Sequence, residues 1–222
     1  MKRREFITLS MTSLGGVLVY TLAREPVWLN AQEGTVRVPL RFFTADEASV
    51  ISAACDRIFP SDESGPGAKE AGVIIYIDHQ LAGPYGRDQY RYTKGPFLET
   101  DRVHGYQGKQ NPQEIYRAGI KDLGGDFVGL GAAQQDERLR GTEQSLFFQM
   151  LRAHTVEGMF CDPMHGGNAN LIGWQMIGFP GPLMSYRKQI GTYNKGEAWR
   201  VKPKSLEQVL GRPIRGWEEE GR

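Results

Sequence analysis

Hydrophobic positions recur at helical spacing in several stretches of the chain, and the clearest of these stretches runs over 142–160. The apolar residues and one histidine that repeat every three or four positions are Leu146, Phe147, Met150, Leu151 and His154. That spacing places the side chains on one face of an α-helix. We therefore predict a helix here that ends at Gly158 or soon after, because glycine commonly terminates helices.

Two other segments carry the signals of a helix start. Thr44 and Glu47 stand three residues apart, which is the spacing of a capping box, and apolar positions follow at helical intervals. These residues predict a helix over 45–59. Asn111 fits the N-cap of another helix, and Pro112 fits its first position, where a missing N–H costs nothing.

Three further segments are less regular. The run 71–83 is rich in β-branched residues but is long enough for a helix, and we interpret it as a helix. The segment 134–140 indicates a short turn or helix, and 36–43 alternates enough for an extended arm or an edge strand. The whole pattern predicts a mainly α fold: a single irregular helical domain with long loops and extended arms.

Between Gly83 and Asn111 the composition changes to Gly, Pro, Tyr, Arg and Gln, with almost no aliphatic periodicity. Long loops inside a domain are usually functional, bound to a partner or disordered. Aromatic residues argue against disorder and are enriched at interfaces, and this segment contains Tyr85, Tyr90, Tyr92, Phe97 and Tyr106. We expect an ordered loop, and we take the arm 34–43, the loop 83–110 and the stretch 171–186 as candidate partner contacts.

The N-terminus has the composition of an export signal. Arg3 and Arg4 are adjacent, Phe6 follows, and the 18 residues Phe6–Ala23 carry no charge. This pattern is typical of a twin-arginine signal, the address of proteins that are exported after folding. We predict a signal segment over 1–31 and one domain over 32–222. Cleavage stays open, because the small-x-small patterns ending at Ala23 and Ala31 are both imperfect, and a retained membrane anchor is the alternative.

The charge of the predicted domain argues against one class of partner. Four of the 27 basic and two of the 26 acidic residues lie in the first 31 positions, so the remaining 191 residues carry a net charge of about −1. A nucleic-acid-binding protein needs a basic patch or stripe. The sequence shows none, and we expect no nucleic-acid partner.

Cys55 and Cys161 are the only cysteines of the chain. In an oxidising compartment they could form a disulfide across a long loop, which would stabilise the fold by roughly 4–5 kcal/mol. Two separate buried thiols are the other interpretation, because free cysteine is among the most buried residue types. The sequence leaves both open.

Familiar cofactor motifs do not occur in the sequence. The stretch 129–134 has glutamine where a dinucleotide-binding loop needs its third glycine, and no predicted strand precedes it. The sequence also has no P-loop, no Gly-x-Ser-x-Gly motif and no Cys-x-x-Cys-His motif. We therefore expect no cofactor bound to this chain.

The stretch "HTVEGMFCDPMHGGN" is the richest in reactive side chains. Its possible metal ligands match no familiar spacing, and they are His154, Glu157, Cys161, Asp162 and His165. A turn is the other interpretation. In it Asp162-Pro163 starts the turn, Gly166 and Gly167 adopt positive φ, and Asn168 bonds to nearby backbone.

The segment that follows, 171–186, is apolar but is interrupted by glycines and prolines, so it cannot form one continuous helix. It is either core or an apolar docking surface, since its residue types are enriched at interfaces. The candidate docking residues are Trp174, Met176, Phe179 and Tyr186.

Several of these segments together resemble the gluconate 2-dehydrogenase subunit 3 family, the small or gamma subunit of membrane-bound flavin sugar dehydrogenases. The matching segments are "KRREF", "AACDRIFP" at 53–60, "QQDERLR" at 134–140, and "LRAHTVEGMFCDPMHGGN" running on into "GWQMIGFPG". The 151–181 stretch is long and specific, and the resemblance covers most of the chain.

The resemblance implies a non-catalytic escort, or chaperone. Its partner would be an FAD-containing large subunit of the glucose-methanol-choline type that lacks its own export signal. A multihaem cytochrome c subunit commonly completes such complexes, which work on the periplasmic face of the inner membrane. The alternatives are an independent periplasmic metal-dependent enzyme and a membrane-anchored structural protein. The sugar or polyol oxidised by the complex is set by the partner.

Overall fold

The computed structural model describes most of the chain between residues 39 and 213. Its ranges are 39–97, 103, 105–183, 185–187, 190–191 and 202–213. The predicted export residues Arg3, Arg4 and Phe6 lie outside them. Within these ranges the protein is mainly helical and has no β-strand, so the predicted fold class is confirmed.

The helices follow one another with short turns or long loops between them. They are α2 (Ala45–Ile58), α3 (Val73–Ala82), α4 (Pro112–Leu123), α5 (Ala132–Gly141), α6 (Leu146–Phe160), α7 (Ile172–Ile177) and α9 (Leu206–Leu210). Three 3-10 turns, η2 (Phe127–Gly129), η3 (Pro163–His165) and η4 (Ala169–Leu171), join some of them. The helix interpretation of 71–83 is confirmed by α3, and α5 is a full helix where only a turn or short helix was predicted.

The capping residues begin the helices as the sequence indicates. At α2, the Thr44 hydroxyl accepts from the backbone N–H of Glu47, and the Glu47 carboxylate accepts from the N–H of Thr44. Asn111 and Glu114 form the same reciprocal pair at α4, with Pro112 in the first turn. Each pair satisfies two backbone donors that would otherwise lack partners.

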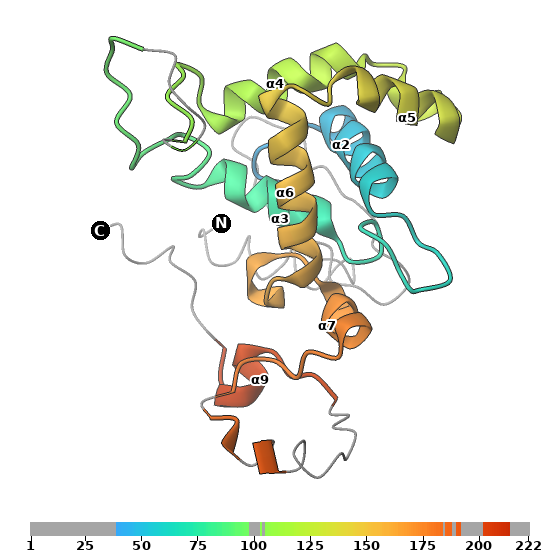
Figure 1. Cartoon of the computed structure of the whole chain (residues 1–222), viewed down its shortest axis with the longest axis vertical. Coiled ribbons are helices and arrows are strands. Elements are labelled where there is room, and N and C mark those ends of the chain that lie inside the picture. The colour runs from blue at the N-terminus through green and yellow to red at the C-terminus, as the bar shows by residue number, and fades with distance from the viewer. Residues whose placement is uncertain are drawn as a thin grey trace, which may run out of the picture.

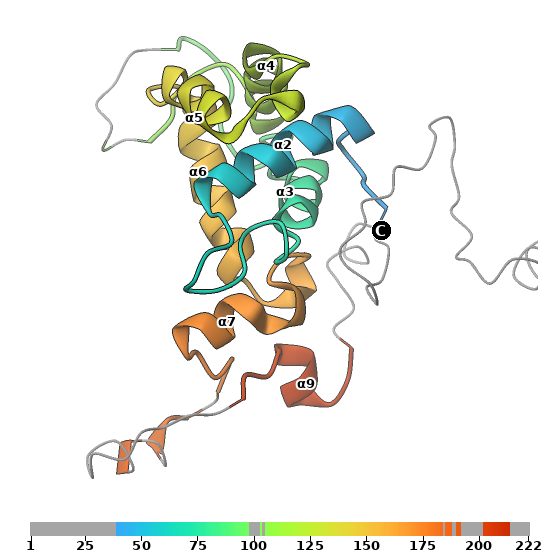
Figure 2. The same cartoon turned by 90° about the vertical axis from the view of Figure 1, so that its right-hand side faces the viewer.

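Helix α6 is the centre of the bundle and packs against α2, α3 and α4, while α4 and α5 lie at one end (Figures 1 and 2). Its buried face carries Phe147, Leu151, His154 and Met159. Large apolar side chains from the neighbouring helices are fully buried in the same core cluster, and they are Ile51, Ile77, Leu81, Tyr116 and Leu123. Three residues of the predicted face, Phe147, Leu151 and His154, are therefore buried as expected, whereas Leu146 at the start of the helix is exposed and Met150 is half-buried.

The residues before α2 form an arm that is fastened to the core by Asp78 of α3. The Asp78 side chain is fully buried, and its Oδ1 accepts from the N–H groups of Phe42 (3.0 Å) and Phe43 (2.9 Å). Its Oδ2 accepts from the N–H of Arg41 (2.6 Å). Both phenylalanine rings are buried, so this described part of the predicted contact arm packs on the chain's own core.

Beyond the end of α6, the chain forms a small lobe that contains α7 and α9 (Figure 2). Asp162, which lies just after α6, joins the end of that helix to α9, because its Oδ2 accepts from the N–H of Leu206 at the start of α9 (2.7 Å). The N–H of Lys204 also donates to the carbonyl of Pro180 (3.1 Å). Among the described helices, none combines the length and the apolar composition that crossing a bilayer requires.

Candidate functional site

The segment that follows α6 is a tight turn whose polar side chains bond to backbone. Asp162 Oδ1 accepts from the N–H of Met164 (3.1 Å), and Pro163 opens the 3-10 turn η3. Gly166 has φ +101°, a left-handed conformation that glycine adopts without strain. Gly167 differs from the sequence prediction: its φ is not positive, but a Cβ there would lie 2.2 Å from the carbonyl oxygen of Gly158. This position needs glycine because the turn touches the backbone of α6.

Asn168 bonds the turn to the end of α6 and to the start of α7. It is fully buried, its N–H donates to the carbonyl of Gly158, and its Nδ2 donates to the carbonyl of Cys161, both at 2.8 Å. Its Oδ1 accepts from the N–H of Gly173 in α7 at 2.8 Å. A single side chain therefore fixes the end of α6 relative to the start of α7.

The two cysteines are free thiols in the structure, so the disulfide interpretation is replaced by that of two separate thiols. Cys55 is buried in α2 and its Sγ accepts from the hydroxyl of Thr155 at 3.4 Å. Cys161 directly follows the last residue of α6 and lies six residues after Thr155, which is about 9 Å along the helix axis. Its Sγ contacts the carbonyl oxygen of Gly158. Burial raises the pKa of Cys55 to about 12 and that of Cys161 to about 11, so both stay protonated.

His154 is enclosed between two tyrosines from distant parts of the chain. The Tyr116 hydroxyl of α4 lies 2.7 Å from His154 Nδ1, and the Tyr85 hydroxyl, just after α3, lies 3.0 Å from Nε2. The Tyr116 ring stacks on the imidazole, and the Tyr85 ring meets it edge-on. Burial lowers the pKa of His154, raises that of Tyr85 to about 12 and raises that of Tyr116 strongly. A neutral imidazole, with one donor and one acceptor nitrogen, bonds to both hydroxyls.

The possible metal ligands of the sequence are not brought together. Tyr76 donates to Glu157 Oε2 (2.9 Å), His154 bonds to its two tyrosines, and Asp162 accepts from backbone N–H groups. Over the part of the chain that the structure describes, no group of three or more His, Cys, Asp or Glu side chains is arranged to hold a metal ion. The metal-dependent alternative therefore has no assembled ligand set among these residues.

The buried histidine should make the stability of the protein sensitive to mild acid. Because the folded-state pKa of His154 lies below its ordinary value of 6.5, the unfolded chain binds its proton first as the pH falls. The contribution of His154 to stability is then complete above about pH 6.5 and declines below it. We expect the free energy of unfolding, measured in urea between pH 7 and 5, to fall more for the wild-type chain than for His154→Gln.

Comparing the wild-type chain with His154→Gln isolates the titration of His154, because glutamine does not titrate but can still donate and accept hydrogen bonds. Hydrogen bonds from Arg138 and Arg57 lower the pKa values of Asp126 and Asp136, respectively. These two carboxyls therefore take up protons below the pH range of the experiment, and they do so in both proteins. Parallel pH profiles for the two proteins would show that His154 titrates alike in the folded and unfolded states, against this prediction.

The apolar stretch 171–186 divides between core and surface. Trp174 is 5% exposed, its Nε1–H donates to the carbonyl of Phe160 (2.7 Å), and its ring packs edge-on against Phe179. Met176 and Phe179 are half-buried, and Tyr186 is 41% exposed. The structure thus places Trp174 in the core of this chain, and Tyr186 is the most exposed of the four residues predicted to dock.

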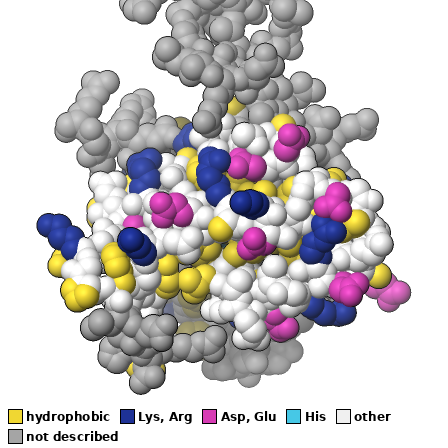
Figure 3. Space-filling model, turned by 90° about the horizontal axis from the view of Figure 1, so that it is seen from above, with side chains coloured by type: hydrophobic (Ala, Val, Ile, Leu, Met, Phe, Trp, Pro, Cys, Tyr) yellow, Lys and Arg dark blue, Asp and Glu magenta, His cyan; other side chains and the backbone are white. Residues whose placement is uncertain are grey.

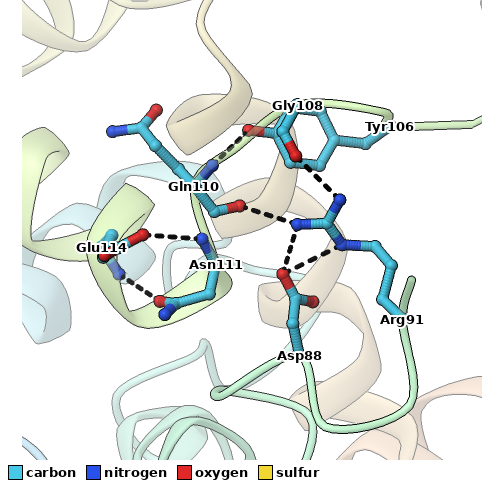
Figure 4. Close-up of polar contacts among 7 residues, drawn as sticks. All are labelled: Asp88, Arg91, Tyr106, Gly108, Gln110, Asn111 and Glu114. Carbon is cyan, nitrogen blue, oxygen red and sulfur yellow. Dashed lines mark hydrogen bonds and ion pairs between the residues drawn. The ribbon is translucent and has the colours of Figure 1, made fainter. Parts of the chain in front are cut away.

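The long loop after α3 is closed at its base by Arg91, a residue that the sequence analysis did not single out (Figure 4). Arg91 Nε donates to Asp88 Oδ2 (2.9 Å), and its Nη1 and Nη2 donate to the carbonyls of Gly108 (2.8 Å) and Gln110 (3.2 Å). The guanidinium also lies 5.0 Å from the centre of the Tyr106 ring. The outgoing and returning parts of the loop are therefore joined. The only local signal was the Asp88–Arg91 spacing.

The face over α4 and α5 has mixed charge. Figure 3 shows basic and acidic side chains interspersed on it, and several form ion pairs, such as Arg138 with Asp126 (2.6 Å) and Arg117 with Glu47 (2.9 Å). A nucleic-acid footprint requires basic side chains gathered on one surface. This face does not have one.

The fold and its side-chain contacts define a small helical protein in which the polar groups hold turns, helix ends and a long loop in place. A family model described as gluconate 2-dehydrogenase subunit 3 matches residues 45–181, which is more than half of the chain. The chain belongs to this family and is an accessory subunit of a multi-subunit dehydrogenase complex. No curated protein and no solved structure matches it.

Proposed function

We propose that this chain is the non-catalytic small subunit of a flavin-dependent sugar or polyol dehydrogenase complex. It binds the FAD-containing large subunit, of the glucose-methanol-choline type, stabilises it, and escorts it in the folded state through the twin-arginine route. The family membership of residues 45–181 is the observation that carries this proposal. A multihaem cytochrome c subunit is the further partner that receives the electrons.

The structural roles of the reactive side chains support a partner that supplies the chemistry. His154 is closed in by two tyrosine hydroxyls, Cys55 is buried and protonated, and Asp162 accepts from two backbone N–H groups. A catalytic acid, base or nucleophile must instead reach the substrate. FAD then belongs to the large subunit and haem to the cytochrome, with neither bound by this chain.

The N-terminal sequence supports the export role. Arg3, Arg4 and Phe6 precede an uncharged run, as in signals that carry folded proteins. A large subunit that folds around FAD in the cytoplasm needs such a route. The complex would then act on the periplasmic face of the inner membrane, and this chain would associate with the membrane through the complex.

Changing the paired arginines tests the proposal directly. The chain is co-expressed with its large subunit in bacteria, with and without Arg3→Lys plus Arg4→Lys, and flavin-dependent dye reduction is assayed in periplasm and cytoplasm. We expect the double variant to leave active, FAD-loaded large subunit in the cytoplasm, because the receptor reads the arginine pair.

A matched control is Arg24→Lys, which makes the same chemical change in the same segment but keeps the pair. It should export the enzyme as the wild-type chain does. If the large subunit reaches the periplasm with the double variant as well, the chain is at most a stabilising subunit and the escort role fails.

A further inference from the structure

We propose that the clasped loop, which is the described segments 84–97 and 105–110 joined by Arg91, is the surface through which this chain binds the flavoprotein large subunit. This inference rests on the proposed function, which supplies the partner, and adds the element that recognises it. Three observations support the inference: hydrogen bonds hold the loop to the helical core, its aromatic side chains are exposed, and its described part is basic.

Both ends of the clasped loop are bonded to the helical core. Gln113 of α4 donates from its side chain to the carbonyl of Leu81 in α3 (2.7 Å) and from its backbone N–H to the carbonyl of Gly86 (3.2 Å). Tyr85 bonds to the buried His154, and Arg91 joins the two arms as described above. A surface that is held in shape before binding loses less conformational entropy on association.

The clasp displays aromatic side chains instead of burying them. Tyr90 is 84% exposed and Tyr92 is 77% exposed, on either side of the fastened Arg91. Aromatic side chains can bury roughly 150–250 Å² each, so this pair alone could supply more than a third of the about 800 Å² that each partner contributes to a standard interface. Tyrosine is also one of the residue types that carry most binding energy at interfaces. The loop therefore has the composition of an interface core, and its two most exposed tyrosines alone could supply a large part of the area.

Charge distinguishes a flavoprotein partner from a second copy of this chain. Arg87 and Lys94 flank the two tyrosines in the sequence, Lys109 lies on the returning part of the loop, and all three are exposed. The carboxylate of Asp88 is neutralised by Arg91, so the described part of the loop is basic. Two copies meeting through this loop would bring like charges together, which opposes association. The complementary surface is an apolar patch on the large subunit with acidic side chains at its rim.

The test compares two pairs of exposed residues. The full chain carries either Tyr90→Ser plus Tyr92→Ser in the clasped loop, or Tyr186→Ser plus Ile190→Ser near the lobe that contains α7 and α9. The dissociation constant for the purified, FAD-loaded large subunit is measured by surface plasmon resonance, and circular dichroism checks the fold. We expect the tyrosine pair to weaken binding at least 30-fold, about the smallest change of one hot-spot side chain. The control pair should change it less than about 3-fold, as most contacts outside a hot spot do.

The outcomes separate this inference from the function on which it rests. If the wild-type chain does not bind the large subunit, the proposed function fails. If the wild-type chain binds and the tyrosine pair binds equally well, or if the control pair alone weakens binding, only the clasped loop is overturned. Sedimentation equilibrium tests whether a second copy of this chain occupies the loop instead. If the chain self-associates, and the double tyrosine variant abolishes this self-association but keeps its affinity for the large subunit, the loop binds a second copy.

Discussion

Replacing Asp78 with alanine is expected to lower the free energy of unfolding by about 3 kcal/mol or more. The substitution removes both acceptors of a fully buried side chain and leaves the N–H groups of Arg41, Phe42 and Phe43 without their partner. Each buried donor left unsatisfied costs roughly 1–3 kcal/mol. Since a domain is stable by only about 5–15 kcal/mol in total, this is a large fraction. Urea unfolding followed by circular dichroism measures it.

Asp78→Asn is the matched variant that separates the three bonds. Its Oδ1 can still accept from Phe42 and Phe43, while the amide group would face the N–H of Arg41, donor against donor. The loss should therefore be clearly smaller than for alanine. Hydrogen exchange at Arg41, Phe42 and Phe43 should quicken in both variants, most of all in alanine. Equal stability of wild type and Asp78→Ala would show that the anchored arm contributes nothing to folding.

The helices could be predicted because their signals are local. The Thr44–Glu47 and Asn111–Glu114 pairs span three residues each, and both form the reciprocal hydrogen bonds of a capping box. The periodicity of 142–160 likewise predicted α6 and the burial of Phe147, Leu151 and His154, although Leu146 is exposed. Capping pairs and helical periodicity depend on residues close together in the same helix, so both can be recognised in the sequence.

The contacts that hold the helices together could not be predicted, because their partners are far apart in the chain. Asp78 bonds to backbone 35 to 37 residues away, and His154 to side chains 38 and 69 residues away. No spacing rule connects such residues, and an aspartate in the middle of an apolar run gives no sign of which N–H groups it will meet. The same holds for Gly167, whose need for glycine arises from the approach of α6.

Composition predicted that the aromatic segments form core or interface, but it could not tell which residues are buried. The loop 83–110 and the stretch 171–186 both contain residue types that are enriched at interfaces. In the structure, Tyr90 and Tyr92 are exposed because the Arg91 clasp closes the loop without burying them. Trp174 is covered by its own chain, because Asn168 turns α7 back onto the end of α6. Burial is a property of the assembled fold, and the composition of one segment does not determine it.

Replacing Trp174 with alanine is expected to destabilise the chain itself by roughly 3–5 kcal/mol. This is the usual cost of truncating a buried tryptophan, because apolar contact is lost and a cavity remains. The indole is 5% exposed, donates to the carbonyl of Phe160 and packs against Phe179. The loss should appear in urea unfolding of the purified chain without any partner.

Two further variants distinguish a core role from a docking role for Trp174. Trp174→Phe keeps an apolar ring but removes the N–H donor, so it should cost less than Trp174→Ala, with about 1 kcal/mol of its loss due to the missing hydrogen bond. Tyr186→Ala, at an exposed site of the same segment, should change stability by no more than about 0.5 kcal/mol. If Trp174→Ala instead leaves the chain as stable as wild type but abolishes binding of the large subunit, Trp174 is a docking residue. Because a core residue and an interface hot spot affect different equilibria, measuring both in the same variant decides between them.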